Sequence, residues 1–391
     1  MLSPLIFKNP ERDQPFVTVV VVTRNSMPNL KGCLGTMTDQ TYRHYSILVV
    51  DSGSTDSTVS YILSNFQMVK VMPIEGNPGY RRGNQIGMLA AEGEYVVVCN
   101  DDVEVDRRWL ETLVQAMEGK PSLGLVTPRI LLHDQPGRIN VAGNTLHYSG
   151  LYGSRGLGEP SEAYGEPEEI AAVSGCCFMI RREALEQLNG FSKDFDHLDT
   201  GWHASYEDVD LSWRAQLSGW EIGYVPQSLL YHKYKRKPTT PEMFCSYEWG
   251  RLLMVLRNYS VMSLILVFPI LMALEVLSWG YALLKGRRWI QARWKVWTWL
   301  IKNAGMVHSM RTAVQKKRVL PDCTLVKRMN PTIRLAHFIP NETVGKIGEW
   351  IMNSIFTVYY RIFCLLLDLS GGVTPAAQQY GKKTCDSSTI R

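Results

Sequence analysis

The N-terminal half of the chain alternates short apolar runs with longer segments of mixed polarity. The runs are rich in β-branched residues and nearly free of charge, so they predict strands that are buried on both faces. They cover residues 16–22, 45–50, 69–72 and 95–99. The segments between them, at about 29–37 and 85–91, have helical character. This order predicts an α/β fold, Rossmann-like, in which a mostly parallel sheet is flanked by crossover helices.

Acidic side chains follow two of these strands directly. Asp51 ends the second strand, and Asn100, Asp101 and Asp102 end the fourth. In open α/β sheets, ligands bind at the edge formed by the carboxyl ends of the strands. Adjacent carboxylates repel unless a cation lies nearby, and a divalent ion that holds a diphosphate uses one or two of them. For the Asp101–Asp102 pair alone, an acidic turn or a helix cap remains an alternative.

The segments after the first and third strands supply side-chain amides, a hydroxyl and a guanidinium group. Thr23 and Asn25 follow the first strand, and Arg82 and Asn84 lie where the helix after the third strand begins. No glycine-rich turn follows the first strand, which argues against a dinucleotide-binding Rossmann domain and against a P-loop. This mixture of groups suits a nucleotide diphosphate together with a metal ion.

A second group of motifs lies beyond residue 170. Residues 173–182 predict a strand, and a short helix follows at 183–188. We expect Cys176 and Cys177 in this strand to be small core residues, because no helix start or neighbouring base activates their thiols.

An acidic pair begins a further predicted helix. Glu207 and Asp208 precede apolar residues at 209, 211, 213 and 217, so the helix starts at the acids. Acids at a helix N-terminus are favoured by its dipole, and capping is the alternative to a catalytic role. Asp210, two residues later, is expected to point away from the site.

The last predicted strand is Gly223–Pro226, and the apolar run 229–231 leads to His232. A single histidine is more often structural than a ligand, and both readings stay open for His232. The basic residues 233–237 either face a phosphate-rich acceptor or are solvated.

These motifs, in this order, resemble those of the inverting glycosyltransferases of family 2, which have the GT-A fold. The resemblance covers about residues 15–240 and rests on Thr-Arg-Asn at 23–25, Asp51-Ser-Gly-Ser-Thr-Asp, Asn77-Pro-Gly-Tyr with Gly83-Asn84, and Asn100-Asp101-Asp102. It departs from the family pattern at Asn100, which replaces the first acid of the Asp-x-Asp motif. The departure weakens any claim that two carboxylates hold the ion.

The resemblance implies a role for each site residue. The donor nucleotide sugar is expected to contact Thr23, Asn25, Asp51, Arg82, Asn84 and Asp101. The divalent cofactor, Mg²⁺ or Mn²⁺, is expected on Asp102, with His232 near the metal or the diphosphate. Asp208 is the expected general base, and Glu207 orients the acceptor or binds it.

The C-terminal part of the chain differs in charge and hydropathy. Residues 285–391 carry 18 Lys and Arg against 5 Asp and Glu, whereas residues 1–284 carry 24 against 32. Val261–Leu284 is long and apolar, and three arrangements fit it: a membrane span, an in-plane or re-entrant segment bent at Pro269, or a buried pair of helices. Tryptophans at 289, 294, 297 and 299 alternate with Lys and Arg, as in a helix at the lipid headgroups. Residues 350–369 predict an amphipathic stretch.

We expect a GT-A catalytic domain at 1–245, a basic, apolar helical membrane-association region at 246–370, and a disordered tail at 371–391.

The functional prediction is transfer of a sugar from a nucleotide diphosphate sugar to a hydroxyl of a lipid-linked or polymeric cell-surface glycan, at the cytoplasmic face of the membrane. The expected partners are the sugar donor, the glycan acceptor and an anionic membrane surface, without nucleic acid. Two alternatives remain: a sugar nucleotidyltransferase, and a non-catalytic membrane-bound scaffold with a GT-A-like domain.

Overall fold

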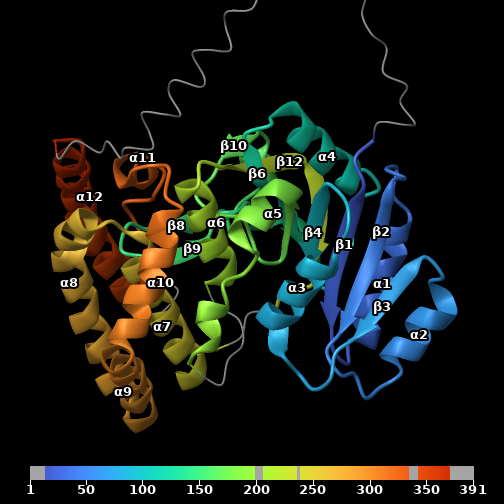
Figure 1. Cartoon of the computed structure of the whole chain (residues 1–391). Helices are drawn as coiled ribbons and strands as arrows, with labels where there is room; N and C mark the ends of the chain where they lie inside the picture. Colours follow the sequence, from blue (N-terminus) through green and yellow to red (C-terminus); the bar gives the residue numbers. More distant parts are fainter. Residues whose placement is uncertain (1–13, 199–205, 236–237, 334–341, 370–391) are drawn as a thin grey trace, which may run out of the picture.

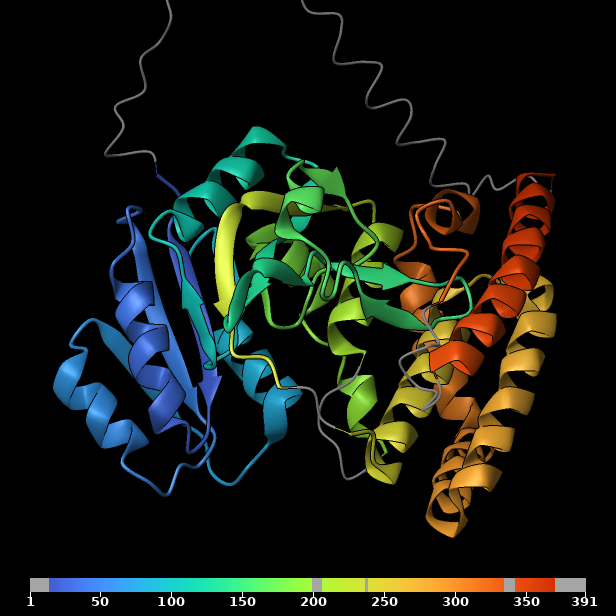
Figure 2. The same cartoon turned by 180° about the vertical axis from the view of Figure 1, so that it is seen from behind.

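The computed structural model describes residues 14–198, 206–235, 238–333 and 342–369. An α/β half built on one twisted sheet lies beside a half made of long helices, and Figure 1 and Figure 2 show the two halves from opposite sides. The expected tail at 371–391 and the basic residues 236 and 237 lie outside the described residues.

The first half of the sheet follows the predicted order. Strands β3, β2, β1 and β4 are neighbours in that order and are parallel. The connecting helices cover both faces of the sheet (Figure 1). The elements are β1 (Val17–Thr23), α1 (Met27–Thr38), β2 (Tyr45–Asp51), α2 (Thr58–Asn65), β3 (Val69–Pro73), α3 (Gly79–Ala90) and β4 (Tyr95–Cys99). The predicted α/β fold with flanking helices is confirmed.

The second half of the sheet is mixed rather than parallel. Strand β11 lies between β4 and β6 and is antiparallel to both, and β12 is parallel to β6. The elements are β5 (Val103–Val105), α4 (Trp109–Gly119), β6 (Leu123–Leu132), β7 (Gln135–Val141), β8 (Asn144–Leu146), β9 (Tyr152–Ser154), β10 (Glu168–Glu169), β11 (Cys177–Arg181), α5 (Arg182–Leu188), α6 (Glu207–Leu217) and β12 (Glu221–His232).

Two strand predictions need correction. The strand predicted at 173–182 is limited to Cys177–Arg181, because residues 173–176 form a turn whose Ser174 carbonyl accepts the Cys177 N–H. The strand predicted at 223–226 is part of β12, which extends to His232. Its pairing with β6 shifts register between Val225 and Leu229, where Pro226 has no N–H to donate.

The helical half begins with α7, which packs against α9 and α10. Its helices are α7 (Pro241–Asn258), α8 (Val261–Lys285), α9 (Arg287–Lys302), α10 (Ala304–Lys316), α11 (Asp322–Val326) and α12 (Glu342–Leu369). The expected domain limit at 245 therefore falls inside α7. Within the described residues, Val261–Lys285 and Lys346–Leu369 are long and apolar enough to cross a membrane by length and composition.

The bend expected at Pro269 does not interrupt the helix, because α8 runs from Val261 to Lys285 with Pro269 inside it. Pro269 is exposed, whereas Val267 and Ile270 on either side of it are buried. The pyrrolidine ring therefore lies outside the packed face, and burial of its neighbours keeps the segment helical.

The contact of α3 with the sheet provides a test of the fold. A Cβ at Gly87 would overlap Val20 Cγ1 and lie 3.0 Å from Val50 Cγ2, both in the sheet core. We expect Gly87→Ala to lower the free energy of unfolding by about 1–3 kcal/mol through overpacking. The control is Gly35→Ala in α1, where nothing lies within 4 Å of the added methyl. Chemical denaturation should show the control unchanged or stabilised by up to about 1 kcal/mol, and an equal effect of both changes would contradict the packing.

Candidate active site

The carboxyl ends of β1 and β2 form one side of the site. Thr23 and Asp51 are register partners at these ends, and both are buried. Asp51 accepts the Ser54 N–H at 3.2 Å, which closes the turn after β2. Asn25 has a φ of 49° and accepts the Thr55 N–H at 2.8 Å. The loops that follow β1 and β2 are thus joined to each other at the sheet edge.

The two acids after β4 have different surroundings. The Asp101 carboxylate accepts the Thr23 hydroxyl at 2.7 Å, and burial raises the pKa of Asp101 to about 6 despite this bond. Burial also opposes ionisation of Asp102, but the neighbouring His232 outweighs it and lowers the pKa of Asp102. At neutral pH, both groups are therefore ionised and Asp102 strongly so.

His232 lies between Asn140 and Asp102. Its Nδ1 is 2.8 Å from Asn140 Oδ1, and its Nε2 is 3.3 Å from Asp102 Oδ1. Nδ1–H donates to Asn140 Oδ1, so a neutral ring directs its Nε2 lone pair, and a protonated ring its Nε2–H, toward the Asp102 carboxylate. Two acceptors at this distance are stable only with a proton or a cation close to both. A histidine that ligates a metal usually donates its other N–H to an oxygen in this way.

The residues expected at the diphosphate lie at the start of α3. Asn84 is buried, and its amide donates to the Tyr80 carbonyl at 3.0 Å. Its Oδ1 has no hydrogen-bond partner among the described residues. Arg81 pairs with Asp196, whereas no ion pair joins Arg82 to any residue that the structure describes.

The acidic pair begins α6, as the sequence predicts, and both carboxylates are buried. Asp208 Oδ2 accepts the Gly175 N–H at 2.7 Å and the Asn144 amide at 3.0 Å, and its Oδ1 accepts the Val209 N–H at 2.9 Å. Burial raises the pKa of Asp208, and these three hydrogen bonds limit the increase. The carboxylate is held firmly, but Oδ1 keeps a lone pair.

The turn before β11 brings the two acidic groups together. Gly175 donates its N–H to Asp208, and the carbonyl of the next residue, Cys176, accepts the Asn100 N–H at 2.9 Å. Since adjacent Cα atoms are about 3.8 Å apart, Asp208 and the Asn100–Asp102 motif border the same short turn. A side chain at Gly175 would have its Cβ 3.2 Å from Asp208 Oδ2 and would crowd the carboxylate.

Three tyrosines around the acidic pair were missed by the sequence analysis as site residues. Tyr80 donates to the Gly175 carbonyl, and the rings of Tyr152 and Tyr247 lie 6.5 Å apart. Burial first, and then the charges of Glu207 and Asp208, raise the pKa of Tyr247. Tyr80 belongs to the Asn-Pro-Gly-Tyr motif, but Tyr247 lies on α7, and no sequence signal connects it with the acids.

The residue before the acidic pair has an unusual backbone conformation. Tyr206 has a φ of 59°, which is rare for a bulky residue and costs about 1–3 kcal/mol. Its ring is buried against Tyr152, at 4.8 Å between centroids, and against α7 at Gly250. A Cβ at Gly250 would lie 2.7 Å from the Tyr206 ring. The packing of α7 therefore holds the backbone that begins α6.

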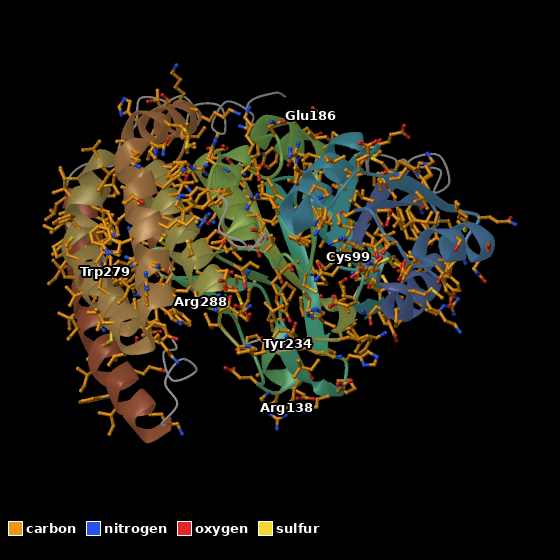
Figure 3. All side chains as sticks on the ribbon, turned by 90° about the horizontal axis from the view of Figure 1, so that it is seen from below. Cys99, Arg138, Glu186, Tyr234, Trp279 and Arg288 are labelled. Carbon is orange, nitrogen blue, oxygen red and sulfur yellow. The ribbon has the colours of Figure 1, made fainter. Side chains whose placement is uncertain are left out.

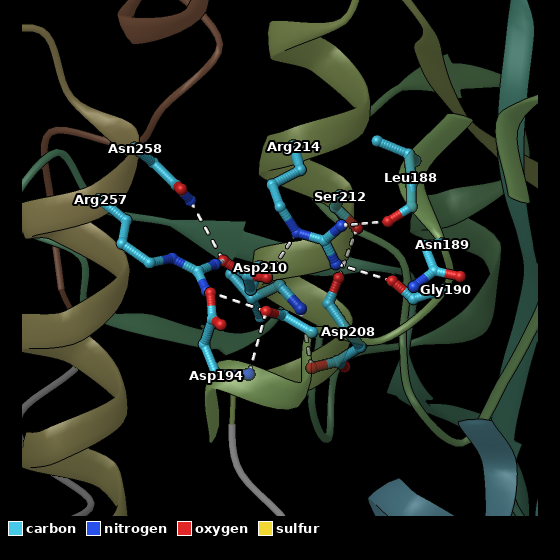
Figure 4. A network of polar contacts seen from close by, with 12 residues as sticks. Leu188, Asn189, Gly190, Asp194, Asp208, Asp210, Ser212, Arg214, Arg257 and Asn258 are labelled. Carbon is cyan, nitrogen blue, oxygen red and sulfur yellow. Dashed lines mark hydrogen bonds and ion pairs between the residues drawn. The ribbon is translucent and has the colours of Figure 1, made fainter. Parts of the chain in front are cut away.

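Asp210 points away from the acidic pair, into a buried ionic cluster (Figure 4). It pairs with Arg214 on its own helix at 2.7 Å and with Arg257 on α7. Arg257 also pairs with Asp194. Burial of Asp210 opposes ionisation, but Arg257 and Arg214 outweigh it and lower its pKa. This Asp210 cluster fixes α6 against α7.

Three of the four tryptophans of α9 are only partly exposed. Trp297 donates its indole N–H to Glu275 at 2.9 Å, and Trp299 donates to the His197 carbonyl at 3.0 Å. Trp294 is the most exposed of the four expected headgroup residues, at 58%. Two of these indoles are thus used inside the protein.

Comparisons with known proteins find similarity to glycosyltransferases. The family described as Glycosyl transferase family 2 matches residues 18–189. An N-acetylglucosaminyl-diphospho-decaprenol L-rhamnosyltransferase of Mycobacterium tuberculosis is 30% identical over 240 residues, which cover 55% of this chain and 75% of that protein. A poly-beta-1,6-N-acetyl-D-glucosamine synthase of Staphylococcus epidermidis is 23% identical, with 58% and 52% covered.

Among solved structures, that of GalNAc-T7 with UDP, GalNAc and Mn²⁺ has a TM-score of 0.51 at 20% identity. The match covers 62% of this chain and 48% of that one. At this identity, the similarity shows a shared fold.

The Asp210 cluster gives a stability prediction. Asp210→Asn leaves Arg257 and Arg214 buried beside a neutral amide, and we expect the free energy of unfolding to fall by about 3–5 kcal/mol. The control is Asp39→Asn, because the Asp39–Arg107 pair has side chains 61% and 66% exposed and contributes less than about 1 kcal/mol. Thermal and denaturant unfolding of both variants check this, and similar losses would show that the cluster has no special role.

Proposed function

Because the chain belongs to glycosyl transferase family 2, we propose that it is an inverting, metal-dependent enzyme of hexosyl- or rhamnosyltransferase type. In this proposal, it moves a sugar from a nucleotide diphosphate sugar to a hydroxyl of a lipid-linked or cell-surface glycan. The observation that carries the proposal is the turn at Gly175–Cys176. The Gly175 N–H donates to Asp208, and the carbonyl of Cys176 accepts the N–H of Asn100, the first residue of the Asn100–Asp102 motif.

The donor occupies the edge formed by β1, β2 and α3. Asp51 and Asn25 hold the base and the ribose, and Thr23 contributes through its hydrogen bond to Asp101. Arg82 and Asn84 face the diphosphate. The Oδ1 of buried Asn84 has no hydrogen-bond partner among the described residues. An amide oxygen accepts, so it suits a hydroxyl of the donor sugar or ribose next to the diphosphate, not a phosphate oxygen.

The residues near Asp102 fit a hard divalent cation such as Mg²⁺ or Mn²⁺. Asp102 Oδ1 and Asn100 Oδ1 are buried without a hydrogen-bond partner among the described residues, and His232 Nε2 is close to the former. The described part of the chain contains no group of three or more His, Cys, Asp or Glu residues that could hold a metal. A site made of Asp102, Asn100 and His232 suits an ion that takes its remaining ligands from phosphate and water. A bound cation stabilises the charge that develops on the departing diphosphate.

Asp208 acts as the general base. The acceptor hydroxyl oxygen forms a bond to the anomeric carbon while the bond to the diphosphate breaks, the diphosphate takes the electron pair, and the proton passes to Asp208 Oδ1. Its raised pKa makes Asp208 a better base than a solvated aspartate. The reaction is a single displacement with inversion and needs no covalent intermediate. Glu207 orients the acceptor or binds it.

The acceptor side is proposed from the relatives and from charge. The mycobacterial relative has a name that describes a sugar diphospholipid, and a diphosphate suits the basic segment after β12. Lys233 in this segment pairs with Glu104 at 2.9 Å, and Lys235 is exposed. The two apolar helices support action at a membrane, and we propose its cytoplasmic face, where nucleotide sugars are found.

The experiment that tests the function is a screen of nucleotide diphosphate sugars with Mg²⁺ or Mn²⁺ in the presence of membrane lipid extract. Release of nucleoside diphosphate that depends on the extract is the expected result. Failure of every donor, together with no binding of any nucleoside diphosphate, would reject the proposal.

Loss of the base gives a specific kinetic result. We expect Asp208→Asn to lower kcat by about 10²–10⁴-fold, since no group then accepts the hydroxyl proton, with nucleotide affinity nearly unchanged. Transfer assays and calorimetric titration with nucleoside diphosphate measure the two quantities. The control is Asp134→Asn, whose side chain is 92% exposed. Turnover of the Asp208 variant at the rate of the unmodified protein would show that the base lies elsewhere.

The second prediction concerns the dependence of transfer on a divalent metal ion. A chelator should abolish transfer, and Mg²⁺ or Mn²⁺ should restore it. Asp102→Asn should raise the metal concentration needed for half-maximal activity at least tenfold, because a single carboxylate anchors the ion. Full activity in excess chelator would contradict the role of Asp102.

A further inference from the structure

Helix α8 buries its polar residues together with part of its apolar ones, and its exposed side carries large apolar residues. Ser263, Glu275 and Ser278 are buried, and Glu275 is the one charged residue between 261 and 284. The exposed large side chains are Val261, Met262, Ile265, Phe268, Met272, Val276, Leu277, Leu283 and Leu284. A helix at a water interface has the reverse arrangement, so this surface is unsuited to water.

Glu275 faces inward because it has partners there. It pairs with Arg251 of α7 at 3.0 Å and with Arg293 of α9, and it accepts the indole N–H of Trp297. Glu248 of α7 pairs with the same two arginines. We call this group of charges the Glu275 cluster. It binds α8 to the body of the protein and leaves the outer side without charge.

Helix α12 extends this apolar surface. It lies beside α8 in both Figure 1 and Figure 2, and Tyr359 donates its hydroxyl to the Leu266 carbonyl at 2.6 Å. Buried Phe356 and Phe363 attach α12 to Tyr148 and Tyr259. Its exposed large apolar residues are Ile347, Trp350, Ile351, Ile355, Val358, Ile362, Leu365, Leu366 and Leu369.

The packing of α8 argues against a transverse membrane span. Buried residues occur along its whole length, from Ser263 to Ala282, where α9 and α12 pack against it and side chains of α7 pair with Glu275 and Ser278. Helix α9 exposes Lys295 and Lys302. If α8 crossed the bilayer, these helices and their charges would enter the hydrocarbon with it, at a cost of several kcal/mol. Only the outer side of α8 is available to lipid.

Basic residues lie at the margin of the apolar surface that α8 and α12 form. Lys285, Arg287 and Arg288 are exposed where α8 meets α9, and Lys346 and Arg361 are exposed on α12. Figure 3 shows Trp279 of α8 in the helical half, on the opposite side of the molecule from the sheet. Apolar helices with a basic margin match the interface of an anionic bilayer, where apolar side chains enter the acyl region and lysines and arginines meet phosphate groups.

We infer that α8 and α12 together form a monotopic docking surface, which lies in the plane of an anionic lipid bilayer without crossing it. This inference builds on the proposed membrane location and specifies the face, the depth and the lipid charge. Docking in this way leaves α7 one helix behind the lipid, with its Gly250 packed on Tyr206, the residue before the acidic pair of the site. The active site is thus held close to the membrane surface, where a lipid-linked acceptor arrives.

The binding test uses vesicles of phosphatidylglycerol and phosphatidylcholine, compared with phosphatidylcholine alone, and the full chain. We expect sedimentation with the anionic vesicles, and Ile265→Asp/Val276→Asp should weaken it at least tenfold. The matched control is Leu63→Asp on α2, a similarly exposed leucine (63%) in the α/β half, which should bind as the unmodified chain does. Lys285→Glu/Arg287→Glu should weaken binding to anionic vesicles, by about fivefold or more for each residue, with no effect on neutral vesicles.

The depth test separates an in-plane helix from a span. A fluorescent residue is placed at Ile265, Met272 or Leu283, which lie on one side of α8, and is quenched by lipids brominated at different depths. We expect one common shallow depth at all three positions. Depths that change by about 1.5 Å per residue along the helix would establish a span and overturn the inference.

Two further outcomes would also overturn it. One is failure of the full chain to sediment with anionic vesicles. The other is concentration-dependent self-association that Ile265→Asp/Val276→Asp abolishes, which would assign the surface to a second copy. Nucleoside diphosphate release with a water-soluble acceptor is measured in parallel, and the α8 variants should retain it. A variant that loses vesicle binding but keeps this activity supports docking, whereas inactivity of the unmodified chain with every donor would reject the transfer reaction alone.

Discussion

The position of the acidic pair depends on how α6 is fixed by the charge on Asp210. This carboxylate is completely buried and shared between Arg214 on the same helix and Arg257 on α7. A buried ionic group adds little net stability, but its partners must meet it in one arrangement. Asp210 therefore favours a single position of α6 relative to α7, and Tyr206, packed on Gly250, fixes the start of the helix. Asp208 lies between these two points and has little freedom to move.

The same residue type has opposite properties at two neighbouring positions of this helix. Both Asp208 and Asp210 are buried, but Asp210 faces two guanidinium groups while Asp208 receives only neutral donors from Gly175, Val209 and Asn144. The pKa is thus lowered at Asp210 and raised at Asp208. A carboxylate with a lowered pKa is a poor proton acceptor and a good structural anchor, and the reverse holds for its neighbour. The division between the anchor, Asp210, and the proposed base, Asp208, follows from the partners that each one meets.

Local pattern predicted the parallel half of the sheet and the convergence of its strand ends, because β-branched runs and the edge rule act over short stretches of sequence. It predicted the start of α6 at Glu207 for the same reason. The antiparallel position of β11 was not predicted, since strand direction depends on the path of residues 103–172, where Gly, Pro and polar residues mask several short strands. Tyr247 and Arg257 were missed as partners of α6, because their contacts join segments 40 or more residues apart. The interpretation of the α9 tryptophans as headgroup residues was weakened by Glu275 and His197, which bind two of the indoles.

Two buried ionic clusters connect the outer surface of the helical half with the site. The Glu275 cluster joins α8 and α9 to α7 through Arg251 and Arg293, and the Asp210 cluster joins α7 to α6 through Arg257. The first contains two acids and two arginines, so its charges balance, and its burial leaves the outer side of α8 free of charge. Apolar packing alone would allow these helices to slide, because leucine and valine contacts have little directional preference. Directional charge contacts at both interfaces instead fix the distance between the apolar outer side of α8 and Asp208. The polar residues inside the helical half thus account both for its apolar exterior and for the position of Asp208.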